Sequence, residues 1–137
     1  MNRRRSSPSR PAAAARTKPD GSLILFEDGR SYRLVYLVYG GDCPAKEFIE
    51  ELDKPRRAKM VSLLNRTAND GLPRNSQRFK PVEGTKLHEF KHFQDRILCH
   101  LDGSTIVLLC GVTKKKDKLS DGDIGRAVRL RDYYEQL

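Results

Sequence analysis

The chain has 137 residues and a mass of 15.7 kDa, which suits one domain with a single buried core. Hydrophobic residues make up 37% of it and charged residues 33%, so the exterior must be heavily charged. The longest apolar stretches, Leu34–Tyr39 and Ile106–Cys110, are far too short to cross a bilayer. These values exclude a membrane-spanning protein and predict a soluble, cytoplasmic one with no membrane partner.

The net charge of +9 is unevenly spread. Residues 1–22 are rich in Arg, Ser, Pro and Ala and carry six basic residues against one acid, which predicts a disordered basic tail. Residues 23–137 form the predicted domain. Within it, residues 74–118 hold ten basic residues against five acids, while acids gather in Glu47–Asp53. This polarity predicts a basic face for a polyanion, although each of these residues also fits a solvated surface.

The first half of the domain predicts two strands and two helices. The strands are Leu23–Phe26 and Tyr32–Tyr39, with a turn at Asp28-Gly29 between them. A helix begins near Pro44, and Lys54-Pro55 restarts the chain into a second helix that ends at Asp70-Gly71. The expected buried residues are Phe48, Ile49 and Leu52 in the first helix and Ala58, Val61, Leu64 and Ala68 in the second.

Three short runs and a final helix follow. The runs are Lys86–His92, Arg96–Leu101 and Thr105–Val112, and Asp102-Gly103 favours a tight hairpin between the last two. Ser120, with Asp123 three residues later, resembles a capping box and starts a helix through Ile124, Ala127, Val128 and Tyr134. The predicted class is α+β: a two-layer domain whose twisted, mostly antiparallel sheet carries a helical hairpin and the C-terminal helix on one face. The other face is expected to stay open, where RNA could lie.

The three cysteines, Cys43, Cys99 and Cys110, form no CxxC pair, and the last two lie in apolar runs. This pattern predicts reduced, buried thiols that pack in the core.

The segment His88-Glu89-Phe90-Lys91-His92 matches HExxH, the motif that places two histidines of a zinc protease one helical turn apart. A helix through this segment is compatible with the apolar spacing around it. Against that interpretation, no third ligand stands out at the usual distance, and five-residue motifs recur by accident. We therefore expect no metal here, and keep a metalloprotease as the last alternative.

Four stretches, in this order and spacing, resemble the HigB-like branch of the RelE/ParE superfamily, a phage-derived-protein family. They are Pro44–Leu52, Gly84–Lys91, Arg96–Leu98 and Ile106–Lys115, and the likeness covers about residues 32–137. The resemblance implies a RelE-like fold and places the HExxH segment on a strand. It also implies the toxin of a type II toxin-antitoxin system, held in check by an antitoxin protein with a helix-turn-helix domain.

Members of that branch resemble one another in cutting mRNA, usually on the ribosome, without a metal or other cofactor, and so in inhibiting translation. The implied chemistry is attack of a ribose 2′-OH on the adjacent phosphate, which needs a base, an acid and cations around the phosphorane. Matching positions imply catalytic roles for Arg96, Lys115, Lys114, Lys91 and Glu89, and His88 joins this catalytic set because its imidazole has a pKa near neutrality. Arg96 and Lys115 are expected to bind the scissile phosphate, and Glu89 is either the base or an ion-pair partner of Lys91 or Arg96.

Other basic residues near this set are assigned to RNA binding: Arg78, Lys80, Lys86, Lys116, Lys118, Arg126 and Arg129. The chain also departs from the branch, because no tyrosine occurs in Lys118–Ser120 and Cys110 stands where histidine is frequent. His88 or His92 could supply the missing acid or base, although a surface histidine on a strand is more often inert. Two further alternatives stay open: a catalytically inactive RelE-fold binding protein of phage origin, and a ParE-like inhibitor of DNA gyrase.

Overall fold

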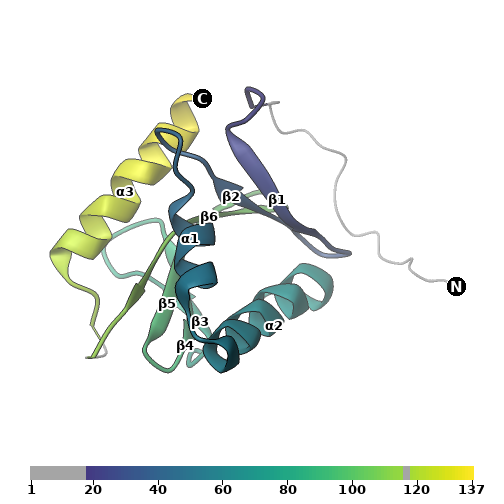
Figure 1. Cartoon of the computed structure of the whole chain (residues 1–137), viewed down its shortest axis with the longest axis vertical. Coiled ribbons are helices and arrows are strands. Elements are labelled where there is room, and N and C mark those ends of the chain that lie inside the picture. The colour runs from purple at the N-terminus through teal and green to yellow at the C-terminus, as the bar shows by residue number, and fades with distance from the viewer. Residues whose placement is uncertain (1–17, 116–117) are drawn as a thin grey trace, which may run out of the picture.

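The computed structural model describes residues 18–115 and 118–137. Within them the chain forms six strands and three helices (Figure 1). In chain order these are β1 (Leu23–Asp28), β2 (Arg33–Leu37), α1 (Pro44–Glu51), α2 (Lys54–Asp70), β3 (Phe79–Pro81), β4 (His88–His92), β5 (Asp95–Asp102), β6 (Thr105–Thr113) and α3 (Asp121–Gln136). The predicted α+β class is confirmed, and the arrangement is compatible with a RelE-like fold.

The described strands form one twisted sheet in the order β1-β2-β6-β5-β4-β3. β2 and β6 pair in parallel, with Leu34 opposite Ile106, and the other neighbouring strands are antiparallel. Leu34 and Val35 of β2 and Val107 and Leu108 of β6 are all buried. Such continuous apolar runs are typical of central strands that are covered on both faces.

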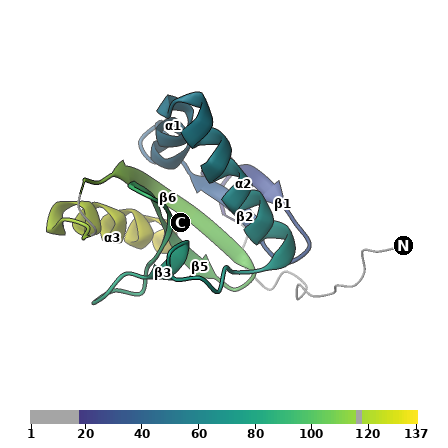
Figure 2. The same ribbon diagram turned by 90° about the horizontal axis from the view of Figure 1, so that it is seen from below.

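Helices cover both faces of this sheet, which corrects the expectation of one open face. Figure 2 shows α1 and α2 on one side of β6 and α3 on the other. Ile49 of α1 and Leu64 of α2 pack with Phe90 and Ile97 on the first face, whereas Leu130 of α3 belongs to a separate cluster on the second. Pattern reasoning missed this because an amphipathic helix shows that it packs on a sheet, without showing on which face.

The helix boundaries follow the capping residues. Asp53 accepts a hydrogen bond from the Arg56 N–H and begins α2, while Ser120 accepts one from the Asp123 N–H and begins α3 as predicted. The buried stripe of α2 is partly different from the prediction, because Ala58 is exposed and Val61 is half-buried. The residues that α2 buries are Met60, Leu63, Leu64, Thr67 and Ala68.

The short edge strand β3 was not predicted, because three residues that include Pro81 carry too little pattern. Residues 1–17 of the predicted tail lie outside the described part of the chain. The rest of that segment contacts the domain: the Lys18 Nζ donates to the carbonyl of Tyr134 at 3.1 Å, and the Val38 N–H donates to the carbonyl of Ser22.

The three cysteines are free and buried, as predicted. Burial raises the pKa of each thiol, that of Cys110 to about 11, which keeps all three protonated and unreactive. None of the described helices combines the length and the apolar character that a membrane span requires.

Candidate functional site

A row of cationic side chains crosses strands β3 to β6 on the face of the sheet that carries α3. We call Lys80, Lys91, Arg96 and Lys114 the basic row. Successive side chains of a strand point to opposite faces of the sheet. Phe90 is buried beneath α1 and α2, so the side chain of the next residue, Lys91, points to the face that carries α3. Lys91 faces Arg96 across the β4–β5 ladder. Lys80 of β3 faces Glu89 of β4, two residues before Lys91 on the same face.

A buried ion pair lies at the centre of this row. Arg96 Nη1 is 3.0 Å from Glu89 Oε1, and the two side chains are 1% and 4% exposed. Of the two roles predicted for Glu89, the structure shows the ion pair with Arg96. Because the guanidinium is enclosed, it acts on a ligand in this conformation chiefly as a fixed positive charge. Lys91 is 8% exposed and is therefore the more accessible of the two facing cations.

The environment of Lys91 disfavours its charged form. Burial lowers its pKa most, and the positive charges of Lys80 and Arg96 lower it further, against the opposing effect of Glu89. A lysine with a lowered pKa carries a larger neutral fraction near pH 7 than a free lysine does. Such an amine can exchange a proton with a substrate, which is the property expected of an acid or base at a reacting centre.

The far end of the row is held by the last helix. Lys114 Nζ lies 2.9 Å from Asp123 Oδ2 in the first turn of α3. Arg126, one turn later, is close enough to Cys110 of β6 to affect its pKa, which places its charge over the same face. The N-terminal half of α3 therefore brings both cationic and anionic groups beside Lys114, and Asp123 partly neutralises that lysine.

The remaining predicted cations are the other RNA-binding candidates and Lys115 of the predicted catalytic set. Lys86, Lys115, Lys118, Arg126 and Arg129 are exposed and Arg78 is half-buried, while Lys116 lies outside the described residues. Lys115 comes two residues after the end of β6. Their exposure suits contacts with phosphates, which mobile surface cations make readily.

His88 lies away from the basic row. It shares the α1–α2 face with Phe90 and His92, and its ring stacks on Phe79 with centroids 5.1 Å apart. Burial lowers the pKa of His88. The structure therefore does not bring His88 together with Lys91 and Arg96.

The HExxH segment is strand β4, as the resemblance implied. Four residues of strand separate His88 and His92 by about 13 Å, too far for two ligands of one metal ion. Among residues 18–115 and 118–137, no three side chains of His, Cys, Asp or Glu converge as a metal site would require.

Two features at the β4–β5 turn escaped the sequence reasoning. Arg56 of α2 donates two hydrogen bonds to the buried Asp95, from Nη2 at 2.5 Å and Nε at 3.0 Å, and Thr113 donates a third. Phe93, in the turn itself, is 74% exposed. The three unassigned residues between the predicted runs Lys86–His92 and Arg96–Leu101 were a signal for a turn at Phe93, whereas no local pattern links Arg56 to Asp95.

The fold and this site define a small α+β protein with a basic row on one sheet face, partly bordered by its last helix. Residues 47–132 match the family described as phage derived protein Gp49-like (DUF891). The match spans more than half of the chain, so the protein belongs to the Gp49-like phage-derived protein family. Comparison with curated proteins gives no match.

Proposed function

We propose that this protein is a toxin of the RelE/HigB kind, which cuts mRNA without a metal and is neutralised by an antitoxin. The observation that carries the proposal is the facing of Lys91 and Arg96 within the basic row. The Gp49-like family is RelE/toxin-like, which supports the same direction. A cationic sheet face of this kind suits a phosphate that gains charge during cleavage.

In the proposed reaction, a ribose 2′-OH attacks the adjacent phosphate and displaces the 5′-oxygen of the next nucleotide. Lys91 exchanges a proton with one of these oxygens, because its lowered pKa enlarges the neutral fraction of the amine relative to that of a free lysine. The charges of Lys80 and Arg96 stabilise the phosphorane, and Glu89 fixes the Arg96 guanidinium. Exposed cations such as Lys115 guide the RNA strand through phosphate contacts.

One observation favours a second candidate, a RelE-fold protein that binds its partner without cutting RNA. Arg96 and Glu89 form an ion pair that is enclosed in the interior, which is also how a purely structural pair is arranged. A gyrase inhibitor of the ParE kind would share the fold, but it would cut no RNA and so would not need Lys80 or Lys91 for cleavage.

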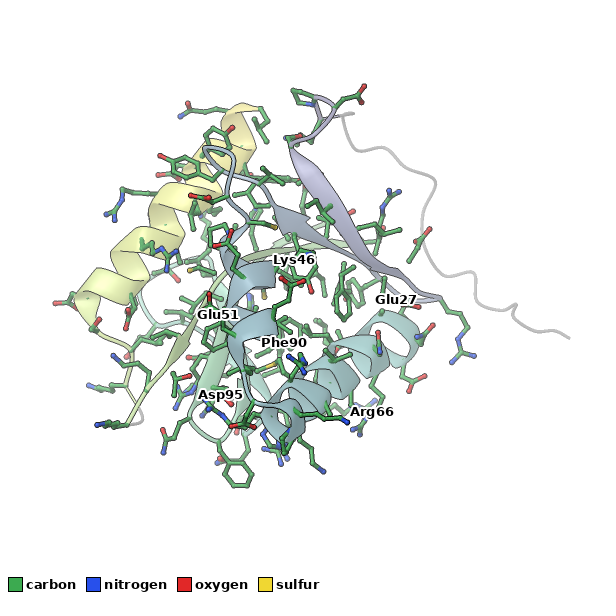
Figure 3. The ribbon with its side chains drawn as sticks, viewed as in Figure 1. Glu27, Lys46, Glu51, Arg66, Phe90 and Asp95 are labelled. Atoms are coloured by element: carbon green, nitrogen blue, oxygen red, sulfur yellow. The ribbon has the colours of Figure 1, made fainter. Side chains whose placement is uncertain are left out.

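Induced expression in a bacterial host separates these functions. We expect rapid arrest of translation, with new mRNA ends at defined codon positions, and an antitoxin encoded beside the chain should restore growth. Lys91→Met should abolish the mRNA ends while the protein stays folded. Arg66→Ala, at an exposed position on α2, is the matched control and should remain toxic (Figure 3).

Growth that is unaffected by the wild-type chain would favour the binding protein. DNA damage without mRNA breaks would favour gyrase inhibition. Unchanged mRNA cleavage by the Lys91→Met variant would remove Lys91 from the reaction.

A further inference from the structure

The turn between β4 and β5 presents an aromatic ring to solvent in an unfavourable backbone conformation. Phe93 is 74% exposed and has a φ of +56°. Among residues 18–115 and 118–137, it alone combines a side chain with a positive φ. Two-residue hairpins with positive φ favour Asn or Gly, because other side chains crowd the backbone there.

Few contacts within the fold offset this cost. The Phe93 ring meets the edge of the His92 ring, with centroids 4.8 Å apart, and the Arg78 guanidinium lies 5.9 Å from its centroid. Most of the ring remains in water. A strained residue with little packing of its own indicates that the ring serves something outside the fold.

Positive charge surrounds the ring. After burial, the charges of Arg78 and Lys59 are the next causes that lower the pKa of His92, so both lie near this turn. The Lys114 N–H donates to the carbonyl of Gln94 at 2.8 Å, which holds the segment after β6 against the turn. The exposed side chain of Lys115 follows directly.

We propose that Phe93 and Arg78 bind one unpaired base of single-stranded RNA by stacking. A ring beside a guanidinium offers two planar surfaces to a base, and base–aromatic stacking tolerates any sequence. Phe93 lies two residues after Lys91, or at most about 7 Å along the chain, so a stacked base lies beside the phosphate at the basic row. This inference rests on the proposed function and defines how its substrate is held.

The test measures affinity separately from cleavage. A fluorescent 12-nucleotide single-stranded RNA with 2′-O-methyl groups has no free 2′-OH to attack, so it stays intact while its anisotropy reports binding to the full chain. We expect Phe93→Gly to weaken binding by about 5- to 150-fold, the range for loss of one stacked base. Phe93→Tyr should bind like the wild type.

The same variants separate stacking from a folding role. Phe93→Gly and Phe93→Asn relieve the positive φ, so their Tm should equal or exceed that of the wild type. Tyr39→Ala removes another exposed aromatic ring, which is paired with Tyr133, and should leave RNA affinity unchanged.

Wild-type affinity in Phe93→Gly, or no binding by the wild-type chain, would overturn the stacking site. A lower Tm in both the Gly and Asn variants would also overturn it, because the ring would then serve folding. If the wild type binds RNA through Phe93 but cuts no mRNA on expression, the proposed ribonuclease fails and the stacking site stands.

Discussion

Glu89 and Arg96 hold each other inside the sheet, with 3.0 Å between Oε1 and Nη1. Both side chains are almost fully enclosed, so neither charge can be left alone at low cost. The pair connects β4 to β5 within the basic row, where Glu89 faces Lys80 and Arg96 faces Lys91. Its integrity is therefore a condition for both folding and function.

Glu89→Gln should lower the free energy of unfolding by about 3–5 kcal/mol, because it removes the carboxylate charge that lies 3.0 Å from the buried Arg96 guanidinium. The double variant Glu89→Leu with Arg96→Met should regain most of this loss, since it removes both charges. Urea unfolding of the three proteins measures the effect. A Glu89→Gln variant as stable as the wild type would contradict the prediction. Loss of toxicity in Arg96→Ala alone would accordingly report folding as much as chemistry.

Asp95→Asn should reduce stability near neutral pH and have little effect in acid. Burial raises the pKa of Asp95, but hydrogen bonds from Arg56 and Thr113 outweigh it and leave that pKa below its usual value. A lowered carboxyl pKa stabilises the fold above the pKa of the unfolded chain, and this contribution is lost as pH falls through the folded value. We expect a Tm lower by about 5 °C at pH 7 and pH 5. The difference in Tm between the wild type and Asp95→Asn should narrow below about pH 4. A difference that widens in acid would contradict a lowered pKa for Asp95.

The sequence predicted the turns and helix ends that depend on a few adjacent residues. Asp102-Gly103 marked the β5–β6 hairpin, and Ser120 with Asp123 marked the start of α3, because turns and caps depend on a few adjacent residues. The parallel pairing of β2 with β6 was not predicted. It depends on contacts between segments about 70 residues apart, which periodicity does not encode.

The candidate site was predicted by composition better than by geometry. Lys91 and Arg96, which the family resemblance placed in the catalytic set, face each other across the β4–β5 ladder. The burial of Arg96 was not expected, because a charged residue in a strand usually indicates a solvated face. His88 was grouped with them because an imidazole has a pKa near neutrality, yet alternation along β4 places it on the other face.

Gly29→Ala should destabilise the fold by about 1–3 kcal/mol through overpacking. A Cβ at Gly29 would lie 2.2 Å from the carbonyl oxygen of Ala68, which accepts hydrogen bonds from the Ser31 and Tyr32 N–H groups and so cannot move freely. Gly125→Ala is the matched control, because its Cβ would meet only the Arg129 guanidinium, at 3.5 Å. Within helix α3 that change should stabilise by about 0.5–1 kcal/mol. Thermal unfolding compares the two variants: Gly29→Ala should lower the Tm and Gly125→Ala should raise it.

The pH dependence of RNA cleavage should report the environment of Lys91. If the neutral amine is the base, cleavage rises with pH to a plateau, and the rise occurs below the pKa of an ordinary lysine because burial and then the charges of Lys80 and Arg96 lower it. Lys80→Met removes one of these positive charges and should raise the pKa of Lys91, which moves the rising limb to higher pH.

Lys91→Met should eliminate the limb, whereas the control Arg66→Ala, at an exposed position on α2, should leave it in place. A limb that falls with pH instead would make Lys91 the acid, and the Lys80→Met variant would then move that falling limb to higher pH as well. A pH profile that is unchanged by Lys80→Met would show that Lys91 takes no part in the proton transfer. The loss of the neighbouring Lys80 charge must change the charge state of Lys91.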